Sequence, residues 1–409
     1  MQRSISSGVR GLMSSLVVAM LMAMPVNAQS LDIADLKARA EAGDLSAQRD
    51  LGEALIYGFG GVSQDVKAGM RQLEQAANGG DIAASRVLGE NLIGGWIIER
   101  DADAGLPFLE QAAAAGDIKA KIALGSFLLY GDWLTQDLDR ATALFEEAAK
   151  DGNGEGLENL GAFLMWGERD AKAGEAYLRR AGALGRGSAW VTLAEGAMYG
   201  YLGAGSRGKF DEFATQARKA RAPRIEVLDA ERQMWGISMR ASGPKTIAKL
   251  EQATEQGNKE ALKFLISLVR DGNQLNIRKE PDRAESYLER FSALLTPTEI
   301  AQFKLSIDAA ETKVVSNYKA LSDRFFAHEE YASTWFGKEL YAANPNFAVY
   351  LLQAEMKRRG QYQGRLNGLA NRATLRAMWQ ECQSLKDNRR CGDTVMHPDV
   401  IGALLAKQP

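Results

Sequence analysis

A phrase of nine residues returns along the chain and constrains its fold more than any other feature. Its copies share an apolar start, small residues in the middle and a glycine near the end, and they occupy residues 73–81, 109–117, 145–153, 178–186 and 250–258. A second phrase precedes the first four copies. Its final glycines are 37, 36 and 36 residues apart, at Gly52, Gly89, Gly125 and Gly161. Two phrases in a period of this length indicate a solenoid of helix hairpins.

Both phrases carry helical signals in the first period. Apolar residues recur there at the spacing of one helix face, at Ala47, Leu51, Ala54 and Leu55. A second helix should begin after Asp65, a favourable N-cap, and end at Gly79. Gly52 lies inside the first helix, where glycine costs about 1 kcal/mol relative to alanine. We therefore expect a neighbouring helix to approach closely at Gly52.

The unit AQRDLGEALIYGFGGVSQDVKAGMRQLEQAANGGD, residues 47–81, resembles the Sel1-like repeat family, a relative of the tetratricopeptide repeat. The resemblance is strong over residues 43–185 and weaker from there to about 295. It implies an all-α protein, a right-handed superhelical α-solenoid of Sel1-like helix hairpins over residues 44–295. Seven helix pairs fit in that range. A lead-in helix is expected at 29–43 and a helical cap and bridge at 296–345.

The remaining residues, 346–409, resemble a small three-helix peptidoglycan-binding domain. The matching positions are Leu352, Gln353, Gly360, Tyr362, Gly364, Asn367, Gly368, Thr374 and Ala377. The resemblance implies Tyr362, Arg365 and Asn367 as glycan-binding residues. Asn367 replaces the usual aspartate, and Glu381-Cys382 stand where the family has an aromatic residue and glutamine. Glycan contact and a retained structural module are therefore both open.

The N-terminus predicts export. Arg3 and Arg10 form a positive segment before an apolar run at 11–25. Small residues follow that run, before a cleavage point at Ala28/Gln29. We expect residues 1–28 to be a signal peptide of a periplasmic protein, with an uncleaved anchor as the alternative. No later segment is long enough to cross a bilayer. In an oxidising compartment, Cys382 and Cys391 are expected to form a disulfide.

The sequence offers no pattern typical of an enzyme. It has two histidines, His328 and His397, and neither stands at a telling distance from a nucleophile or a carboxylate. No run of metal ligands or phosphate-binding loop is recognisable. A net charge of −2 gives no field that would recruit nucleic acid. We therefore predict no catalytic residues, no metal and no cofactor.

An aromatic series recurs at the hairpin turns. Its members follow the first helix of each pair, mostly by five residues after the glycine position, and are Tyr57, Trp96, Tyr130, Trp166 and Tyr199. Tyrosine and tryptophan are favoured at protein-binding hot spots, so these residues are candidate partner anchors. The alternative, which we favour, is that they join successive turns of the solenoid.

The family resemblance implies a periplasmic scaffold that mediates protein–protein interactions in cell-envelope assembly. Exopolysaccharide secretion or its regulation is the sharper expectation, with a secretion complex or a sensor ectodomain as the partner. The alternative is a peptidoglycan-binding accessory protein of a cell-wall enzyme.

Overall fold

The computed structural model describes residues 33–95, 97–168, 170–203, 205–385 and 388–407. These residues form helices joined by turns and loops, without a strand among them. The fold is thus all-α, as the sequence predicts. The chain divides into two compact units, residues 1–222 and 223–409, which are described separately. The expected signal peptide, residues 1–28, lies outside the described residues.

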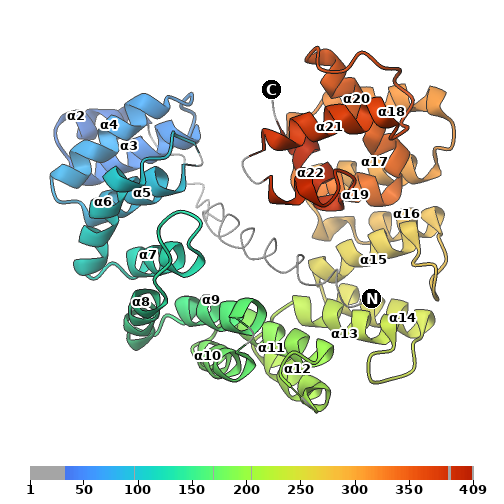
Figure 1. Ribbon diagram of the computed structural model, residues 1–409, viewed down its shortest axis with the longest axis horizontal. Coiled ribbons are helices and arrows are strands. Elements are labelled where there is room, and N and C mark those ends of the chain that lie inside the picture. The colour runs from blue at the N-terminus through green and yellow to red at the C-terminus, as the bar shows by residue number, and fades with distance from the viewer. Residues whose placement is uncertain (1–32, 96, 169, 204, 386–387, 408–409) are drawn as a thin grey trace. The chain divides into compact units, whose positions relative to one another are not determined.

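Unit 1 is a row of helix hairpins preceded by one helix, α2 (Ile33–Glu41). The hairpins are α3 (Leu45–Tyr57) with α4 (Val66–Asn78), α5 (Ile82–Gly94) with α6 (Ala102–Ala114), α7 (Ile118–Tyr130) with α8 (Leu138–Lys150), α9 (Glu155–Phe163) with α10 (Ala171–Ala183), and α11 (Gly187–Tyr199) with α12 (Phe210–Lys219). Figure 1 shows α5, α7 and α9 on one side of this row and α6, α8 and α10 on the other. Successive hairpins pack against each other and share their apolar residues.

Aspartates begin the helices of this row at regular intervals. The Asp44 carboxylate accepts the backbone N–H of Ala47 at 3.1 Å, and Asp65 accepts that of Ala68 at 2.9 Å. The same cap starts the next four helices and α10, at Asp81, Asp101, Asp117, Asp137 and Asp170. Each cap satisfies a backbone donor that the first helical turn leaves free. The periodic aspartates therefore fix where the helices start.

Glycines allow the two helices of a hairpin to touch. A Cβ at Gly52 would lie 2.9 Å from the carbonyl oxygen of Gly69, and one at Gly69 would lie 2.6 Å from that of Gly52. The close approach predicted at Gly52 is confirmed. Gly105 and Gly174 contact the first helix of their hairpins as Gly69 does in the first hairpin. In these hairpins the close contact is therefore made by a pair of glycines. The sequence pattern had singled out one member of each pair.

Unit 2 continues with two hairpins and ends in a helical cluster. The hairpins are α13 (Arg224–Trp235) with α14 (Gly243–Glu255) and α15 (Lys259–Asp271) with α16 (Pro281–Arg290). The cluster consists of α17 (Pro297–Glu311), α18 (Tyr318–Phe326), α19 (Thr334–Ala343), α20 (Pro345–Arg358), α21 (Arg372–Gln383) and α22 (Pro398–Ala406). The boundary between the two units thus falls within the range expected for the solenoid, while the hairpin pattern continues on both sides of it.

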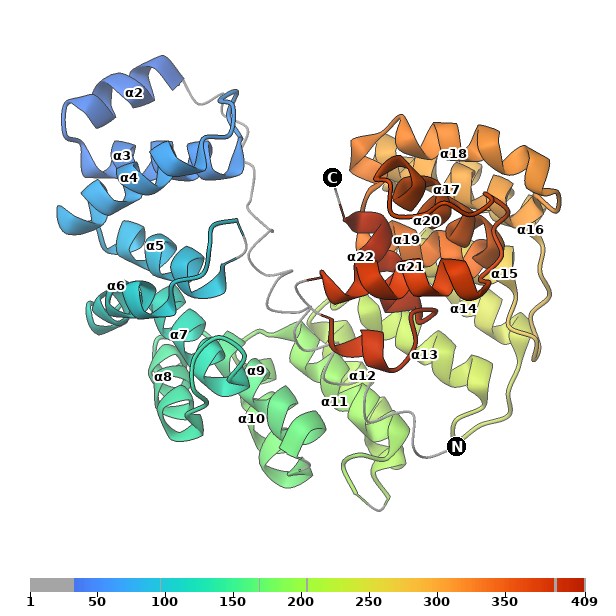
Figure 2. The same ribbon diagram turned by 45° about the horizontal axis from the view of Figure 1, so that its top comes forward.

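The last six long helices of unit 2 share one apolar core. Phe336 on α19 belongs to the same buried cluster as Leu351 on α20, Met378 on α21 and Ile401 on α22. Figure 2 shows α17, α18 and α19 beside α20, α21 and α22. Residues expected to form a bridge, 296–345, are therefore part of the body that holds the C-terminal helices.

One disulfide joins α21 to the loop that follows it. Cys382 on α21 is disulfide-bonded to Cys391, and their Cα atoms are 5.8 Å apart. Among the helices of the described ranges, none is both long and apolar enough to cross a membrane.

Candidate interaction surfaces

The aromatic series lies at one end of the hairpins in unit 1. Tyr57, Tyr130 and Tyr199 are the last residues of α3, α7 and α11, and Trp166 lies in the π-helical turn that follows α9. Tyr57 and Tyr199 are 39% and 46% exposed, whereas Tyr130 and Trp166 are half-buried. Trp96 lies outside the described residues.

Three of these aromatics contact the next hairpin. The Tyr57 hydroxyl is 3.1 Å from Nδ2 of Asn91 on α5. The Tyr130 ring meets Phe163 edge-on with centroids 5.9 Å apart, and Trp166 meets Tyr201 in the same way at 4.7 Å. Burial raises the pKa of Tyr130 to about 12. The series therefore joins successive hairpins, which is the second of the two roles considered for it. A role in partner binding remains a prediction.

A ladder of ion pairs also joins the hairpins of unit 1. Arg49 on α3 pairs with Asp81, the cap of α5, at 2.9 Å, and Arg86 on α5 lies 3.6 Å from Asp117, the cap of α7. Further along, Glu158 on α9 pairs with Arg186 at the start of α11 at 2.7 Å. Glu158 and Arg186 occupy the repeat positions of Arg49 and Asp81, so the same contact recurs with its charges reversed.

The ladder includes carboxylates that are shielded from water. Glu90 is buried and accepts from Arg86 at 3.2 Å. Burial raises the pKa of Glu53 and of Glu90, and Arg86 opposes this effect at both. Glu155 shows the same raised pKa from burial, opposed by Arg186. The sequence reasoning missed this ladder, although a basic residue three positions before Gly52 and again before Gly89 was a visible signal.

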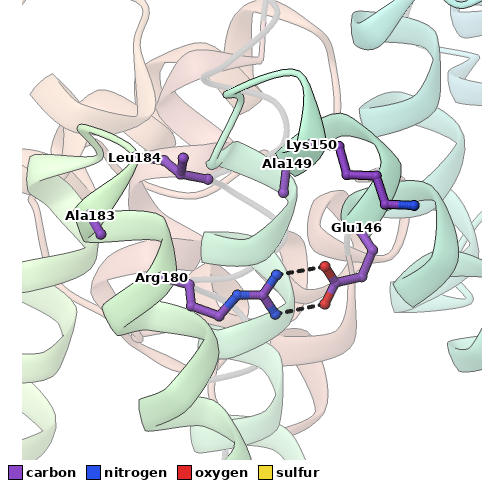
Figure 3. Close-up of a pocket in the computed structure, with 6 residues that line it drawn as sticks. All are labelled: Glu146, Ala149, Lys150, Arg180, Ala183 and Leu184. Carbon is purple, nitrogen blue, oxygen red and sulfur yellow. Dashed lines mark hydrogen bonds and ion pairs between the residues drawn. The ribbon is translucent and has the colours of Figure 1, made fainter.

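A shallow hollow of about 320 Å³ lies between α8 and α10 on the other side of unit 1. Its lining residues, labelled in Figure 3, are Glu146, Ala149, Lys150, Arg180, Ala183 and Leu184. Arg180 donates to both carboxylate oxygens of Glu146, at 2.7 and 2.6 Å. Glu146 and Arg180 thus satisfy each other's charge.

The glycan-binding candidates of unit 2 surround the buried amide of Gln353. Its oxygen accepts the backbone N–H groups of Asn367 and Gly368, each at 2.9 Å, and its nitrogen donates to the side chains of Thr374 and Asn367 at 3.0 and 3.2 Å. The Tyr362 hydroxyl lies 3.1 Å from Thr374 Oγ1. Gln353 therefore ties the 362–369 loop to helices α20 and α21.

This network changes the interpretation of two candidates. Tyr362 is buried and its hydroxyl bonds within the module, so in this structure it shapes the loop, and glycan contact through Tyr362 remains a prediction. Asn367 uses its side-chain oxygen on Leu369 N and Gln353, which makes it a turn-forming residue. Arg365 is exposed and remains a predicted contact. The family motif thus marks residues that shape the loop.

Both histidines contact neighbouring groups of their own segments. His328 stacks on Tyr331 and lies 3.1 Å from Glu330, and both members of that pair are exposed. His397 begins α22, where its Nδ1 accepts the N–H of Asp399 at 3.2 Å. Within the ranges that the structure describes, no group of three or more His, Cys, Asp or Glu residues is placed to hold a metal ion.

No model of a known protein family matches the chain, and no curated protein matches it. Among the solved structures that are similar to this chain are the following three. A protective antigen of uropathogenic Escherichia coli with an SLR fold is 18% identical, with a TM-score of 0.42 over 91% of this chain and 85% of that one. A Sel1 repeat protein from Oxalobacter formigenes is also 18% identical, with a TM-score of 0.39 over 92% and 98% of the two chains. A Pseudomonas aeruginosa protein is 19% identical, with a TM-score of 0.33 over 54% and 83%. By its own helices, the described part of the chain is an all-α helical-repeat protein.

Proposed function

We propose that this chain is a periplasmic scaffold of Sel1-like hairpins that holds partner proteins during cell-envelope assembly. The observation that carries the proposal is the regular row of hairpins in unit 1, which repeats the same small set of side chains at a fixed spacing. Such arrays present extended surfaces suited to protein partners. Tyr57 and Tyr199, at the ends of α3 and α11, are the exposed aromatic anchors in this row.

Two features support a periplasmic location. Residues 1–28 have the pattern of a signal peptide. The Cys382–Cys391 disulfide is of the kind that persists in an oxidising compartment. Within the envelope, we propose exopolysaccharide secretion or its regulation as the process, with a secretion complex or a sensor ectodomain as the partner. This last step rests on the family resemblance.

Crosslinking in intact cells tests the scaffold. A photo-crosslinking amino acid at Tyr57 or Tyr199 should capture the same partner protein, because both positions lie on the hairpin ends of unit 1. A crosslinker at Ala115, which is exposed in the turn between α6 and α7 at the opposite end of the hairpins, serves as the control. Capture of secretion proteins or a sensor ectodomain would support the proposal. Equal capture from Ala115, or no protein captured from Tyr57 and Tyr199, would refute it.

A second candidate function is that of a peptidoglycan-binding accessory protein. The favouring observation is that Gln353 holds the 362–369 loop in a fixed shape with Arg365 exposed on it. Isolated sacculi should then retain the full-length protein, and Arg365→Ala should weaken retention. Arg240→Ala, which removes another exposed arginine of unit 2, should leave retention unchanged. Passage of the natural protein through sacculi without retention would exclude this role.

A further inference from the structure

An exposed strip of helix α21 has no explanation in the fold. Arg372, Arg376 and Trp379 are spaced by four and three residues and so lie on one face of the helix. The strip is about 10 Å long at 1.5 Å per residue. Trp379 is 50% exposed, whereas the opposite face of α21 buries Ala377, Met378 and Cys382.

The 362–369 loop extends this strip at the start of α21. The Tyr362 hydroxyl donates to the carbonyl oxygen of Arg365 at 3.2 Å and also contacts Thr374 in the first turn of the helix. Gln353 donates to the carbonyl oxygen of Leu369 at 3.1 Å. The backbone beneath Arg365 and Leu369 is thereby fixed against α21, while both side chains are exposed. We call Arg365, Leu369, Arg372, Arg376 and Trp379 the α21 face.

The positive charges of the α21 face are uncompensated. Across the ranges described, Arg365, Arg372 and Arg376 make neither an ion pair nor a side-chain hydrogen bond. The one acidic residue of α21, Glu381, is buried and is bound by Lys407 at 2.8 Å and Arg359 at 3.5 Å. The face also lies at the helix N-terminus, where the backbone dipole adds further positive potential.

The chemistry of this face selects its partner. A guanidinium group donates hydrogen bonds and accepts none, and its planar fork matches a carboxylate. Arginine and tryptophan are also the residues enriched at protein-binding hot spots. Sugar hydroxyls donate as well as accept hydrogen bonds, and the side chains of the α21 face, which are arginine, leucine and tryptophan, supply no acceptor.

We propose that the α21 face docks an acidic segment of a partner protein. Carboxylates of that segment pair with Arg365, Arg372 and Arg376, and an apolar side chain packs on Trp379 and Leu369. The inference rests on the proposed scaffold function, because it assigns a partner surface to unit 2 and names the chemistry of the segment that binds there.

The test uses the full-length chain in cells, with a photo-crosslinking amino acid at Gln380, which is exposed on α21 one turn after Arg376. The crosslinked peptide should come from a protein and carry several Asp or Glu residues. Arg372→Glu and Trp379→Ala should each lower the yield by about tenfold. Substituting lysines for the captured acidic residues should restore the yield with Arg372→Glu.

Matched controls come from another exposed site of unit 2. Trp235 is 51% exposed, and Arg240 follows it in the same turn region. Trp235→Ala and Arg240→Glu should leave the Gln380 crosslink unchanged. Thermal unfolding of each variant checks that it is folded.

The outcomes separate the two proposals. Crosslinks from Gln380 to muropeptides, to lipids or to a protein segment without acidic residues would overturn the docking inference, as would a yield that Arg372→Glu leaves unchanged. If Gln380 captures no protein while Tyr57 does, only the docking inference fails. If neither position captures a protein, the scaffold function fails with it.

Discussion

The most decisive stability prediction concerns Arg270 on α15. Its side chain is 0% exposed and is surrounded by polar partners. The guanidinium donates to Ser306 on α17 at 2.7 Å and to Asp271 at 2.7 and 2.6 Å, and its Nη1 is 3.1 Å from the Glu339 carboxylate on α19. Burial alone would lower the pKa of Arg270, but the bonds to Asp271 and Glu339 raise it overall. Arg270 thus links the last hairpin to the terminal cluster.

Arg270→Met keeps much of the volume and removes the charge. Two carboxylates that are about one-fifth exposed, Asp271 and Glu339, then lose their main cation. Breaking a buried pair from one side costs about 3–5 kcal/mol. For a unit of this size, each kcal/mol shifts Tm by about 2–4 °C, so Tm should fall by about 6–20 °C. The double variant Arg270→Met with Glu339→Leu should recover part of the loss, because it removes one of the two unpaired carboxylates and leaves Asp271.

Urea and thermal unfolding followed by circular dichroism would measure both effects. The control is Arg290→Met, which removes an arginine whose side chain is 62% exposed and pairs with Glu255. Its loss should be below about 1 kcal/mol because exposed ion pairs contribute little. The reasoning would be refuted if Arg270→Met cost no more than this control, or if the double variant were less stable than the single one.

Three further predictions concern the hairpins and their caps. The double variant Glu158→Arg with Arg186→Asp should be at least as stable as the natural protein. It keeps the ion pair and adds about 1 kcal/mol from a side-chain N-cap, which α11 lacks. A double variant that is less stable in urea than Glu158→Arg alone would contradict this. Gly69→Ala should cost about 1–3 kcal/mol by forcing α3 and α4 apart, while Gly208→Ala, which meets no atom within 4 Å, should be neutral in the same assay. Burial opposes ionisation of Glu299, but hydrogen bonds from two lysines prevail and lower its pKa from 4.5 to about 2. Its stabilising effect is therefore present above pH 4.5 and lost as the pH falls toward 2, so Glu299→Gln should flatten that part of the stability–pH curve, and an identical curve would count against the assignment.

The C-terminal helices show what a motif can and cannot indicate. The peptidoglycan-binding resemblance pointed to Tyr362 and Asn367, which the fold uses to build a loop. Arg372, Arg376 and Trp379 carried no motif, although their spacing already placed them on one helix face. The spacing alone did not show which face of the helix is buried, because either face of an isolated helix can be the exposed one.

The sequence by itself determined the helices and their order. Asp44, Asp65 and Asp81 cap helices through the backbone N–H groups three residues further on, and Gly52 marks the close contact between the two helices of its hairpin. These signals are local, so they can be read before any partner helix is known. The spacing of the two phrases then gave the hairpin period.

Only the tertiary structure decided which side chains meet across hairpins. The Arg49–Asp81 contact, its reversal at Glu158 and Arg186, and the enclosure of Arg270 each join residues 28 to 69 positions apart. A charge at such a position reads as a solvated residue of its own helix until the neighbouring helix is in place. The physical reason is that burial, and with it the strength of an ion pair, depends on packing between helices and not on the period within one.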